Sequence, residues 1–302
     1  MPSSERWRPD WRSSRICSGV MNTTMRSPRS VLYVPAHRPK MLAKLDTIPA
    51  DLLVVDLEDG VAPAEKNAAR ETLLEAAARR ELPGNRWALR VNAAGSPALE
   101  ADLALADELG PPAVVLPKAE EPAAIARLAD RWASRGASTL LMIETASGVG
   151  HSRALAAAHP SVSTLLYGSA DLRLSLGARP DADRVWERHA MSEILLAARM
   201  ARCAAIDAVT FRFRDDALLE REARIARDLG FDGKSCIHPG QLETVHRVFS
   251  STSTEVDWAE RVLAAWREQN GDREGVVVMD GEMIEALHLD VARRILERRP
   301  GS

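Results

Sequence analysis

The feature that most constrains this chain is a regular alternation of two kinds of segment. From Ser30 onward, short apolar runs rich in β-branched residues alternate with longer Ala-, Leu-, Glu- and Arg-rich stretches of helical periodicity. The short runs predict eight strands, at 31–34, 52–57, 87–91, 113–116, 139–143, 162–167, 208–210 and 233–237. The longer stretches predict helices at 64–80, 98–109, 122–134, 147–158, 184–204 and 217–229. Such alternation with apolar strands indicates parallel strands covered by helices.

Eight strand–helix units in about 220 residues predict an α/β fold, a (β/α)₈ TIM barrel. A doubly wound open sheet is the alternative, but it usually has a glycine-rich first turn, and this chain reads Val-Pro-Ala-His-Arg-Pro there. We expect a barrel over 29–250, preceded by a disordered extension at 1–28. A C-terminal extension at 251–302, with elements at 255–269, 276–279 and 283–296, is expected to act as a lid that completes the active site, here or in a neighbouring subunit.

Composition and charge exclude several classes of protein. The 302 residues carry a net charge of −3 and only 4% aromatics, so neither nucleic acid nor a membrane surface is an expected partner. Three widely spaced cysteines fit neither a disulfide framework nor a zinc site, which makes a reducing cytoplasm the simplest location. The Ser/Arg-rich start lacks the apolar core of a secretory signal. A transit peptide, or a true start at Met21 or Met25, is the alternative there.

Polar residues follow the predicted strands where each one ends. Acids and bases stand at Asp56 to Asp59, Arg90 to Asn92, Lys118, Glu144, Asp171 and Lys234 to His238. In a TIM barrel these strand ends meet on one rim, which is the face that holds active sites. Carboxylates from different strands favour Mg²⁺, whereas the scarcity of Cys and His argues against zinc. An arginine among the acids is suited to a substrate carboxylate.

Ordered motifs along the chain resemble the HpcH/HpaI aldolase family, in its citrate lyase beta subunit-like (CoA ester lyase) branch. The resemblance covers about 29–296. It rests on Arg-Ser-Val-Leu-Tyr-Val-Pro at 29–35, Asp-Leu-Glu-Asp-Gly-Val at 56–61, Arg-Val-Asn at 90–92 and Leu-Pro-Lys at 116–118. It continues with Ile-Glu-Thr at 143–145, the turn at 168–171, Ile-Asp at 206–207, the 230–241 segment and Asp-Gly-Glu-Met-Ile at 280–284. The order and spacing of these pieces are more specific than any single one.

The resemblance implies roles for residues at the rim. Glu144 and Asp171 look like the Mg²⁺ ligands, and Arg90 looks like the clamp for a substrate carboxylate. Structural alternatives are a rim acid and a helix cap for the first two, and for Arg90 a salt bridge to the acids of 56–59. Glu58 and Asp59 look like groups that hold metal waters or Arg90.

The resemblance also implies a coenzyme A site after the first strand. Lys40 and Lys44, with Arg38, stand where family members contact the CoA phosphates, and a solvated helix face is the alternative. Tyr33 and the turn at Ile237 and His238 would line the thioester pocket, largely through backbone; for His238 we favour a structural role over that of a general base.

Two departures from the family pattern concern chemistry. Ala36 replaces a glycine found in many relatives. Glu285 stands where several relatives carry a catalytic Asp followed by a proline two residues on, and that proline is Leu287 here. Glu285 is therefore the expected acid/base group, with Asp280 as a second candidate and a plain surface residue as the alternative.

These observations predict a Mg²⁺-dependent carbon–carbon lyase. The expected reaction is reversible Claisen cleavage of a β-hydroxyacyl-CoA, of malyl-, citramalyl- or citryl-CoA type, to an acyl-CoA and a 2-oxo acid, with thioester hydrolysis open. The alternatives are an aldolase of free 2-oxo acids and a catalytically reduced binding or assembly subunit. The extension makes a homo-oligomer the expectation, and the family suggests a trimer.

Overall fold

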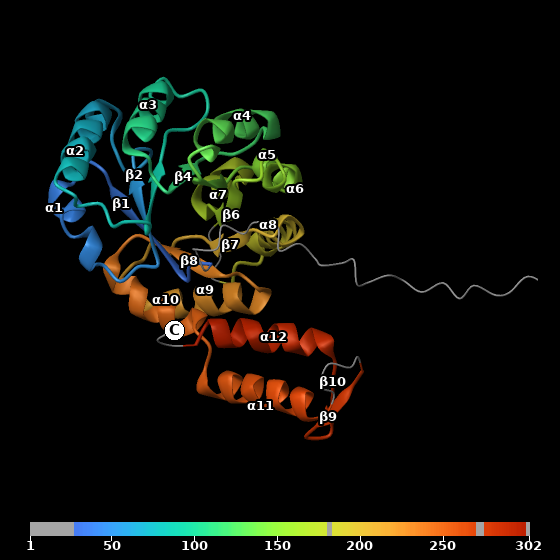
Figure 1. Ribbon diagram of the computed structural model, residues 1–302. Helices are drawn as coiled ribbons and strands as arrows, with labels where there is room; N and C mark the ends of the chain where they lie inside the picture. Colours follow the sequence, from blue (N-terminus) through green and yellow to red (C-terminus); the bar gives the residue numbers. More distant parts are fainter. Residues whose placement is uncertain (1–26, 180–182, 270–274, 300–302) are drawn as a thin grey trace, which may run out of the picture.

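Eight parallel strands close into a barrel, as Figure 1 shows. The computed structural model describes residues 27–179, 183–269 and 275–299. The strands are β1 (Ser30–Pro35), β2 (Leu52–Asp56), β3 (Trp87–Arg90), β4 (Ala113–Leu116), β5 (Ser138–Ile143), β6 (Val162–Tyr167), β7 (Ala204–Asp207) and β8 (Gly233–Cys236). Each strand pairs with its neighbours in sequence, and β8 returns to β1. The predicted TIM barrel is confirmed, and the open-sheet alternative is excluded.

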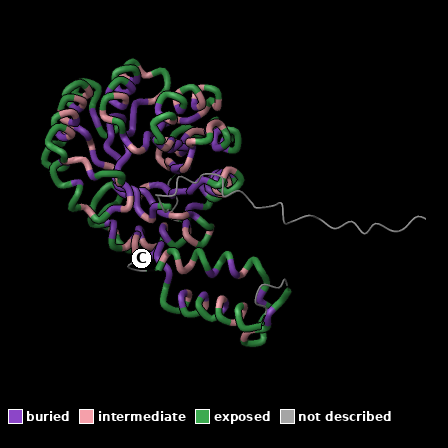
Figure 2. Tube along the Cα trace, viewed as in Figure 1, coloured by how far each residue is buried: buried purple, intermediate pink, exposed green. Residues whose placement is uncertain are grey.

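Helices surround the barrel and leave their outer faces exposed (Figure 2). They are α1 (Pro39–Leu42), α2 (Lys66–Ala78), α3 (Leu99–Leu109), α4 (Pro122–Ala133), α5 (Ala146–Gly150), α6 (Ser152–Ala156), α7 (Ser169–Leu176), α8 (Glu187–Ala201), α9 (Asp216–Leu229) and α10 (Leu242–Phe249), with short 3₁₀ turns at Leu45–Thr47, Pro63–Glu65 and Pro239–Gln241. The single helix expected at 147–158 is two short helices, α5 and α6, which meet at His151. None of the helices in the described part of the chain is both long and apolar enough to cross a bilayer.

Alternation along the strands separates two cores. Inward-facing residues such as Val54, Val115 and Leu166 fill the barrel, and Tyr33 packs against them. Residues one position away, such as Leu53, face the helices in a larger cluster. This separation matters for the site because Asp56 and Arg90 continue the inward-facing positions of β2 and β3, so both side chains point into the mouth of the barrel.

Closure of the barrel requires a glycine at the start of β8. A Cβ on Gly233 would lie 2.2 Å from the carbonyl oxygen of Pro28 and 2.5 Å from that of Arg29. Backbone atoms cannot move aside as a flexible side chain can, so any larger residue would push β8 away from the segment that leads into β1.

The seventh strand lies four residues earlier than predicted, at Ala204–Asp207 and not at 208–210. Its last residue is stabilised by contacts distant in sequence: both carboxylate oxygens of Asp207 accept bonds from Arg184, and Lys234 donates to Oδ2 at 2.7 Å. Asp207 and Lys234 are fully buried. Since Asp207 is one position from the inward-facing Ile206, this network lies between strands and helices. Lys234 therefore does not belong to the polar rim, contrary to the prediction.

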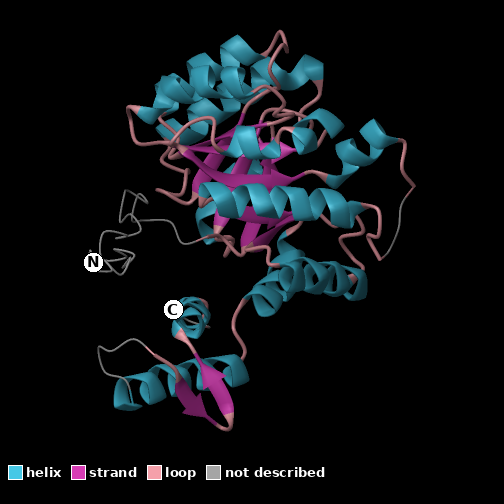
Figure 3. Ribbon diagram, turned by 90° about the vertical axis from the view of Figure 1, so that its right-hand side faces the viewer, coloured by secondary structure: helices cyan, strands magenta, loops and turns pink. Residues whose placement is uncertain are grey.

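The C-terminal residues form a separate helix–hairpin–helix unit. It consists of α11 (Ser253–Gln269), the antiparallel strands β9 (Val277–Met279) and β10 (Glu282–Ile284), and α12 (Ala286–Glu297), with its own small apolar core. Figure 3 shows this unit below the barrel. Met283 lies in β10, so the element expected at 283–296 is divided between this strand and a helix that begins at Ala286. The N-terminal extension lies outside the described residues except for Ser27 and Pro28.

Candidate active site at the mouth of the barrel

The polar residues after strands β2 to β6 meet in one cluster at the C-terminal end of the barrel. Arg90 forms a two-bond salt bridge to Asp56, with Nε–Oδ1 at 2.7 Å and Nη2–Oδ2 at 2.6 Å. Its remaining terminal nitrogen, Nη1, lies 3.2 Å from Oε2 of Glu58. The guanidinium lies over the Tyr33 ring, 4.9 Å from the centroid. Nη1 also donates to the sulfur of Met142 at 3.4 Å. The salt bridge to Asp56 therefore exists, and Nη1 is the only terminal nitrogen of Arg90 that Asp56 does not bind, so a substrate carboxylate would bind there in place of these weaker contacts.

Asp56 positions the loop that carries the next acids. Its carboxylate also accepts the backbone N–H groups of Glu58 and Gly60, at 2.8 and 2.9 Å. Arg90 and these donors hold the pKa of Asp56 below its usual value although burial acts in the opposite direction. Asp56 is thus an ionised anchor. Sequence reasoning placed it in the rim without giving it this role.

Lys118 joins the acids of three loops. It takes a left-handed backbone conformation with φ of 49°, and its ammonium lies 2.6 Å from Glu58 Oε1, 3.5 Å from Asp59 Oδ2 and 3.6 Å from Asp171 Oδ2. Its backbone N–H donates to Oε1 of Glu144 at 2.8 Å. Lys118 was missed as a site residue, although its place directly after β4 was the available signal. Its charge partly offsets the repulsion among the surrounding carboxylates.

Glu144 and Asp171 are close enough to influence each other electrostatically. Glu144 is 4% exposed, and burial first, then the neighbouring charges of Glu58 and Asp171, raise its pKa to about 7. Gly168 makes room for it, because a Cβ there would lie 2.5 Å from Oε2 of Glu144. A buried carboxyl group with a raised pKa beside a second acid gains from a bound cation.

The donor set fits Mg²⁺ and not a fully protein-bound metal. Within the described residues, no three His, Cys, Asp or Glu side chains gather to hold an ion by themselves. Mg²⁺ commonly takes one or two carboxylates and keeps water or substrate oxygens. Glu58 Oε2, buried without a hydrogen bond, can accept from such a water. Glu144 and Asp171 would hold the ion, with Glu58 beside it.

The raised pKa of Glu144 gives a stability prediction. The folded pKa of about 7 lies above an unfolded value near 4.5, so the metal-free protein loses stability as pH rises between these values, by about 3 kcal/mol at most. Glu144→Gln keeps an acceptor for Lys118 and removes the charge. In urea unfolding with EDTA, it is expected to be more stable than the wild type at pH 8, with little difference at pH 4.5. The exposed Glu121→Gln serves as control, and an equal stability of Glu144→Gln and wild type at pH 8 would contradict the raised pKa.

The predicted CoA residues lie on the same rim. Arg38 and Lys40 begin α1 directly after β1, Lys44 follows it, and all three are exposed. Near them around the barrel, Met41, Phe211 and Ile237 expose apolar side chains. Ala36 is fully buried in the outer core.

The turn after β8 has a clear structural role. Gln241 Oε1 accepts the N–H groups of Ile237 and His238, so these two donors are already used. His238 accepts the N–H of Gly240 through Nδ1 and stacks on Phe213 with ring centroids 4.9 Å apart. This supports a structural role for His238. Tyr33 lies beneath Arg90 inside the barrel.

The two predicted acid/base residues lie elsewhere in the chain. Asp280 forms the β9–β10 turn and pairs with Arg261. Glu285 is exposed at the start of α12, where its backbone N–H bonds to His288. Figure 1 shows β9 and β10 far from the strand ends that carry the cluster. One protomer therefore does not bring Glu285 or Asp280 to Glu144.

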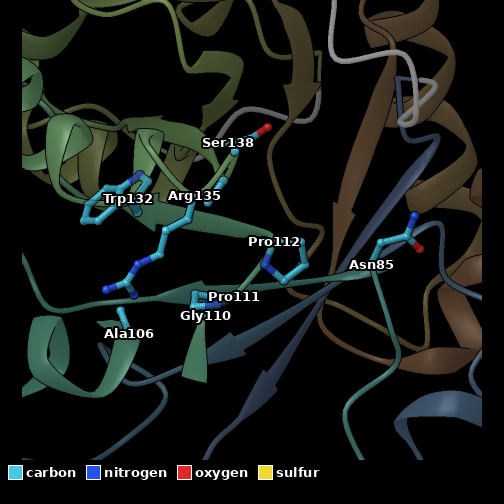
Figure 4. Close-up of a pocket in the computed structure, with 10 residues that line it drawn as sticks. Asn85, Ala106, Gly110, Pro111, Pro112, Trp132, Arg135 and Ser138 are labelled. Carbon is cyan, nitrogen blue, oxygen red and sulfur yellow. The ribbon is translucent and has the colours of Figure 1, made fainter. Parts of the chain in front are cut away.

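Away from the acidic cluster, the structure has a pocket of about 240 Å³, which Figure 4 shows in close-up. Its lining includes Pro112 and Ser138, which precede or begin β4 and β5, so the pocket lies at the opposite end of the barrel from the acidic cluster.

Comparisons with known proteins agree with the geometry. Residues 29–239 match the family model of HpcH/HpaI aldolase/citrate lyase. A (3S)-malyl-CoA thioesterase of Cereibacter sphaeroides is 37% identical over 277 residues, covering 89% of this chain and 94% of that protein. The mitochondrial citramalyl-CoA lyase of Homo sapiens is 32% identical over 275 residues, covering 85% and 81%. The crystal structure of CitE from Mycobacterium tuberculosis with magnesium, acetoacetate and coenzyme A superposes with a TM-score of 0.78 at 34% identity, covering 91% of this chain and 98% of that one. This chain belongs to the HpcH/HpaI aldolase/citrate lyase family.

Proposed function

We propose that this protein is a Mg²⁺-dependent carbon–carbon lyase that cleaves a β-hydroxyacyl-CoA of malyl-, citramalyl- or citryl-CoA type. The observation that carries the proposal is the pair of Glu144 and Asp171 beside Arg90 at the mouth of the barrel. The CoA-ester chemistry of the relatives and the Mg²⁺ and coenzyme A bound by the CitE structure support the same assignment. No sequence departure touches these three residues.

The chain's own groups account for recognition. Arg90 Nη1, turned away from Asp56, would bind the carboxylate of the 2-oxo acid part, while Asp56 and Tyr33 fix the guanidinium. Lys40, Lys44 and Arg38 would bind the CoA phosphates. The exposed Met41, Phe211 and Ile237 would contact the less polar arm of the thioester.

Cleavage breaks the bond between the α- and β-carbons of the acyl group. A base removes the β-hydroxyl proton, the β-carbon becomes the carbonyl of the 2-oxo acid, and the electron pair passes to the thioester enolate, which takes a proton to give acyl-CoA. Bound Mg²⁺ supplies Lewis-acid stabilisation of negative oxygen, worth several kcal/mol. Water reaching the thioester would give hydrolysis, as in the malyl-CoA thioesterase relative.

We assign the acid/base role to Glu285 of a neighbouring subunit, with Asp280 second. Val278, Met283, Leu287 and Val291 expose apolar surface on the C-terminal unit, between 41% and 64% of each residue. Such a surface is suited to packing on another protomer. A homo-oligomer, for which the family suggests a trimer, would bring Glu285 over a neighbour's Glu144 as a lid.

Hybrid oligomers test this arrangement. Glu144→Ala and Glu285→Ala are each expected to lose almost all turnover. Hybrids purified through a different tag on each chain should regain it, with one active site in three for a cyclic trimer that contains both chains. The restored site combines Glu144 of one chain with Glu285 of its neighbour. Inactive hybrids, or a fully active Glu285→Ala oligomer, would remove Glu285 from the mechanism.

Coenzyme A affinity separates the proposal from an aldolase of free 2-oxo acids. Calorimetric titration of the wild type with CoA should show saturable binding, weakened by salt because exposed cations bind the phosphates. Absence of CoA binding together with turnover of free 2-oxo acids would favour the aldolase.

A further inference from the structure

Besides the pocket of about 240 Å³, a larger cleft lies at the opposite end of the barrel from the acidic cluster. It is a cleft of about 850 Å³, and its walls come from the segments that lead into β1, β2, β3 and β8 and from the last turns of α12. Figure 3 shows α12 beneath the barrel. The cleft therefore lies between the barrel and the C-terminal unit.

Arginines dominate the lining of this arginine cleft. Seven arginines and three acids line it, and three further acids just outside the lining, Asp46, Glu255 and Glu260, pair with Arg86, Arg227 and Arg299. The arginines still outnumber these six acids by one, in a protein whose net charge is −3. The arginines are Arg29, Arg86, Arg199, Arg227, Arg294, Arg298 and Arg299, and the acids are Asp51, Asp232 and Glu297. The local charge is thus opposite in sign to that of the whole chain.

Several of these guanidinium groups are held in place by the barrel. Asp232 is shared by two of them: Oδ2 accepts from Arg199 and Oδ1 from Arg298, each at 2.8 Å. Arg29 forms a salt bridge to Asp51 at 2.9 Å. Arg227 reaches Glu255 through Nη2 alone. Each guanidinium has five N–H donors, so donors remain after these bonds.

The neighbouring positive charges affect the pKa of Arg298. Burial, and then the nearby charges of Arg199 and Arg227, lower the pKa of its guanidinium, whereas Asp232 acts in the opposite direction. Arg294 lies one turn earlier on the same face of α12 and is exposed. The acids in and beside the cleft are fewer than its arginines.

We propose that the arginine cleft binds a small anion that carries several phosphate groups. Fixed arginines bind phosphate oxygens through charge-assisted and paired hydrogen bonds. The volume exceeds the needs of a single phosphate and suits a chain of them. Arg294 lies in α12 and Arg298 directly follows it, whereas Arg29 and Arg199 belong to the barrel side. The bound anion would therefore also fasten the C-terminal unit to the barrel.

Inorganic triphosphate is the probe for the test. The full-length protein is used with EDTA, so that no divalent ion at the acidic cluster can bind the triphosphate. Calorimetry should show saturable binding, and thermal unfolding should shift upward with ligand concentration. Within the described residues the side chain of Arg294 forms no hydrogen bond or ion pair that a substitution would break, and Arg294→Glu should weaken binding by about tenfold or more.

Matched variants make the result specific. Arg293→Glu makes the same charge change one residue away, where the side chain pairs with Asp290 outside the cleft, and it should bind as the wild type does. Lys40→Glu/Lys44→Glu removes the proposed CoA-phosphate site on the opposite face, and the triphosphate binding that Arg294→Glu weakens should remain in this variant. No binding by the wild type, equal weakening by Arg293→Glu and Arg294→Glu, or loss only in the lysine variant would each overturn the arginine cleft while leaving the lyase proposal standing.

Discussion

Glu144→Ala is expected to lower turnover of the CoA thioester by about a thousandfold, because it removes one of the two carboxylates proposed to hold Mg²⁺. Lewis-acid stabilisation is worth several kcal/mol, and about 4 kcal/mol corresponds to a thousandfold change in rate. The side chain is almost fully buried and accepts one backbone bond from Lys118, which alanine also loses. The measurement is steady-state turnover at saturating Mg²⁺, together with Mn²⁺ affinity by electron paramagnetic resonance.

A matched control shows that the loss is local. Glu121 is an exposed acid at the start of α4, without a side-chain cap bond, so Glu121→Ala should keep both turnover and Mn²⁺ affinity. Glu144→Ala should remain folded by circular dichroism and bind Mn²⁺ at least tenfold more weakly. Wild-type Mg²⁺-dependent turnover in Glu144→Ala would show that the metal is held elsewhere.

Arg90→Met is expected to have the largest effect on stability. It leaves the carboxylate of Asp56, which is 2% exposed, without its counter-ion, and removing one partner of a buried pair costs about 3–5 kcal/mol. Without Arg90, burial would raise the pKa of Asp56 in the folded state. The loss of stability, measured by urea unfolding, should therefore shrink as pH falls and Asp56 becomes protonated.

Arg90→Lys separates anchoring from substrate binding. It keeps a positive charge near Asp56, so it should cost less stability than Arg90→Met. It loses the planar guanidinium and its Nη1 edge, so turnover should fall strongly in both variants. If Arg90→Lys turned over substrate as the wild type does, Arg90 would be an anchor for Asp56 alone.

The barrel could be predicted from sequence because its signals are local and repeated. Seven of the eight strands overlap the ranges predicted for them, although β8 reads Gly-Lys-Ser-Cys and has no β-branched residue. The exception, β7, reads Ala-Ala-Ile-Asp and ends in a buried acid. Its Asp207 is tolerated because Arg184 and Lys234, 23 and 27 residues away, neutralise it, and no local pattern reports such contacts. In contrast, Asp280-Gly281 was an available hairpin signal for β9 and β10.

The sequence predicted which residues make up the acidic cluster, but not which of them contact one another. Strand ends placed Glu58, Arg90, Glu144 and Asp171 on one rim, and the structure brings them together. The sequence could not show that Asp56 accepts hydrogen bonds from two nitrogens of Arg90, or that Lys118 contacts acids that follow three different strands. These contacts depend on side-chain directions that are set when the barrel closes. The sequence also could not place Glu285, whose relation to the site depends on how protomers assemble.

The products formed from CoA thioesters distinguish a carbon–carbon lyase from a thioesterase and from an inactive protein. Purified wild-type protein would be given malyl-, citramalyl- and citryl-CoA, with Mg²⁺ or with EDTA, and the products identified by mass spectrometry. We expect Mg²⁺-dependent release of an acyl-CoA and a 2-oxo acid from at least one of them; free CoA with the uncleaved acid would instead identify hydrolysis at the thioester. No Mg²⁺-dependent change in any of the three thioesters, by a protein that still binds the metal, would contradict the lyase proposal.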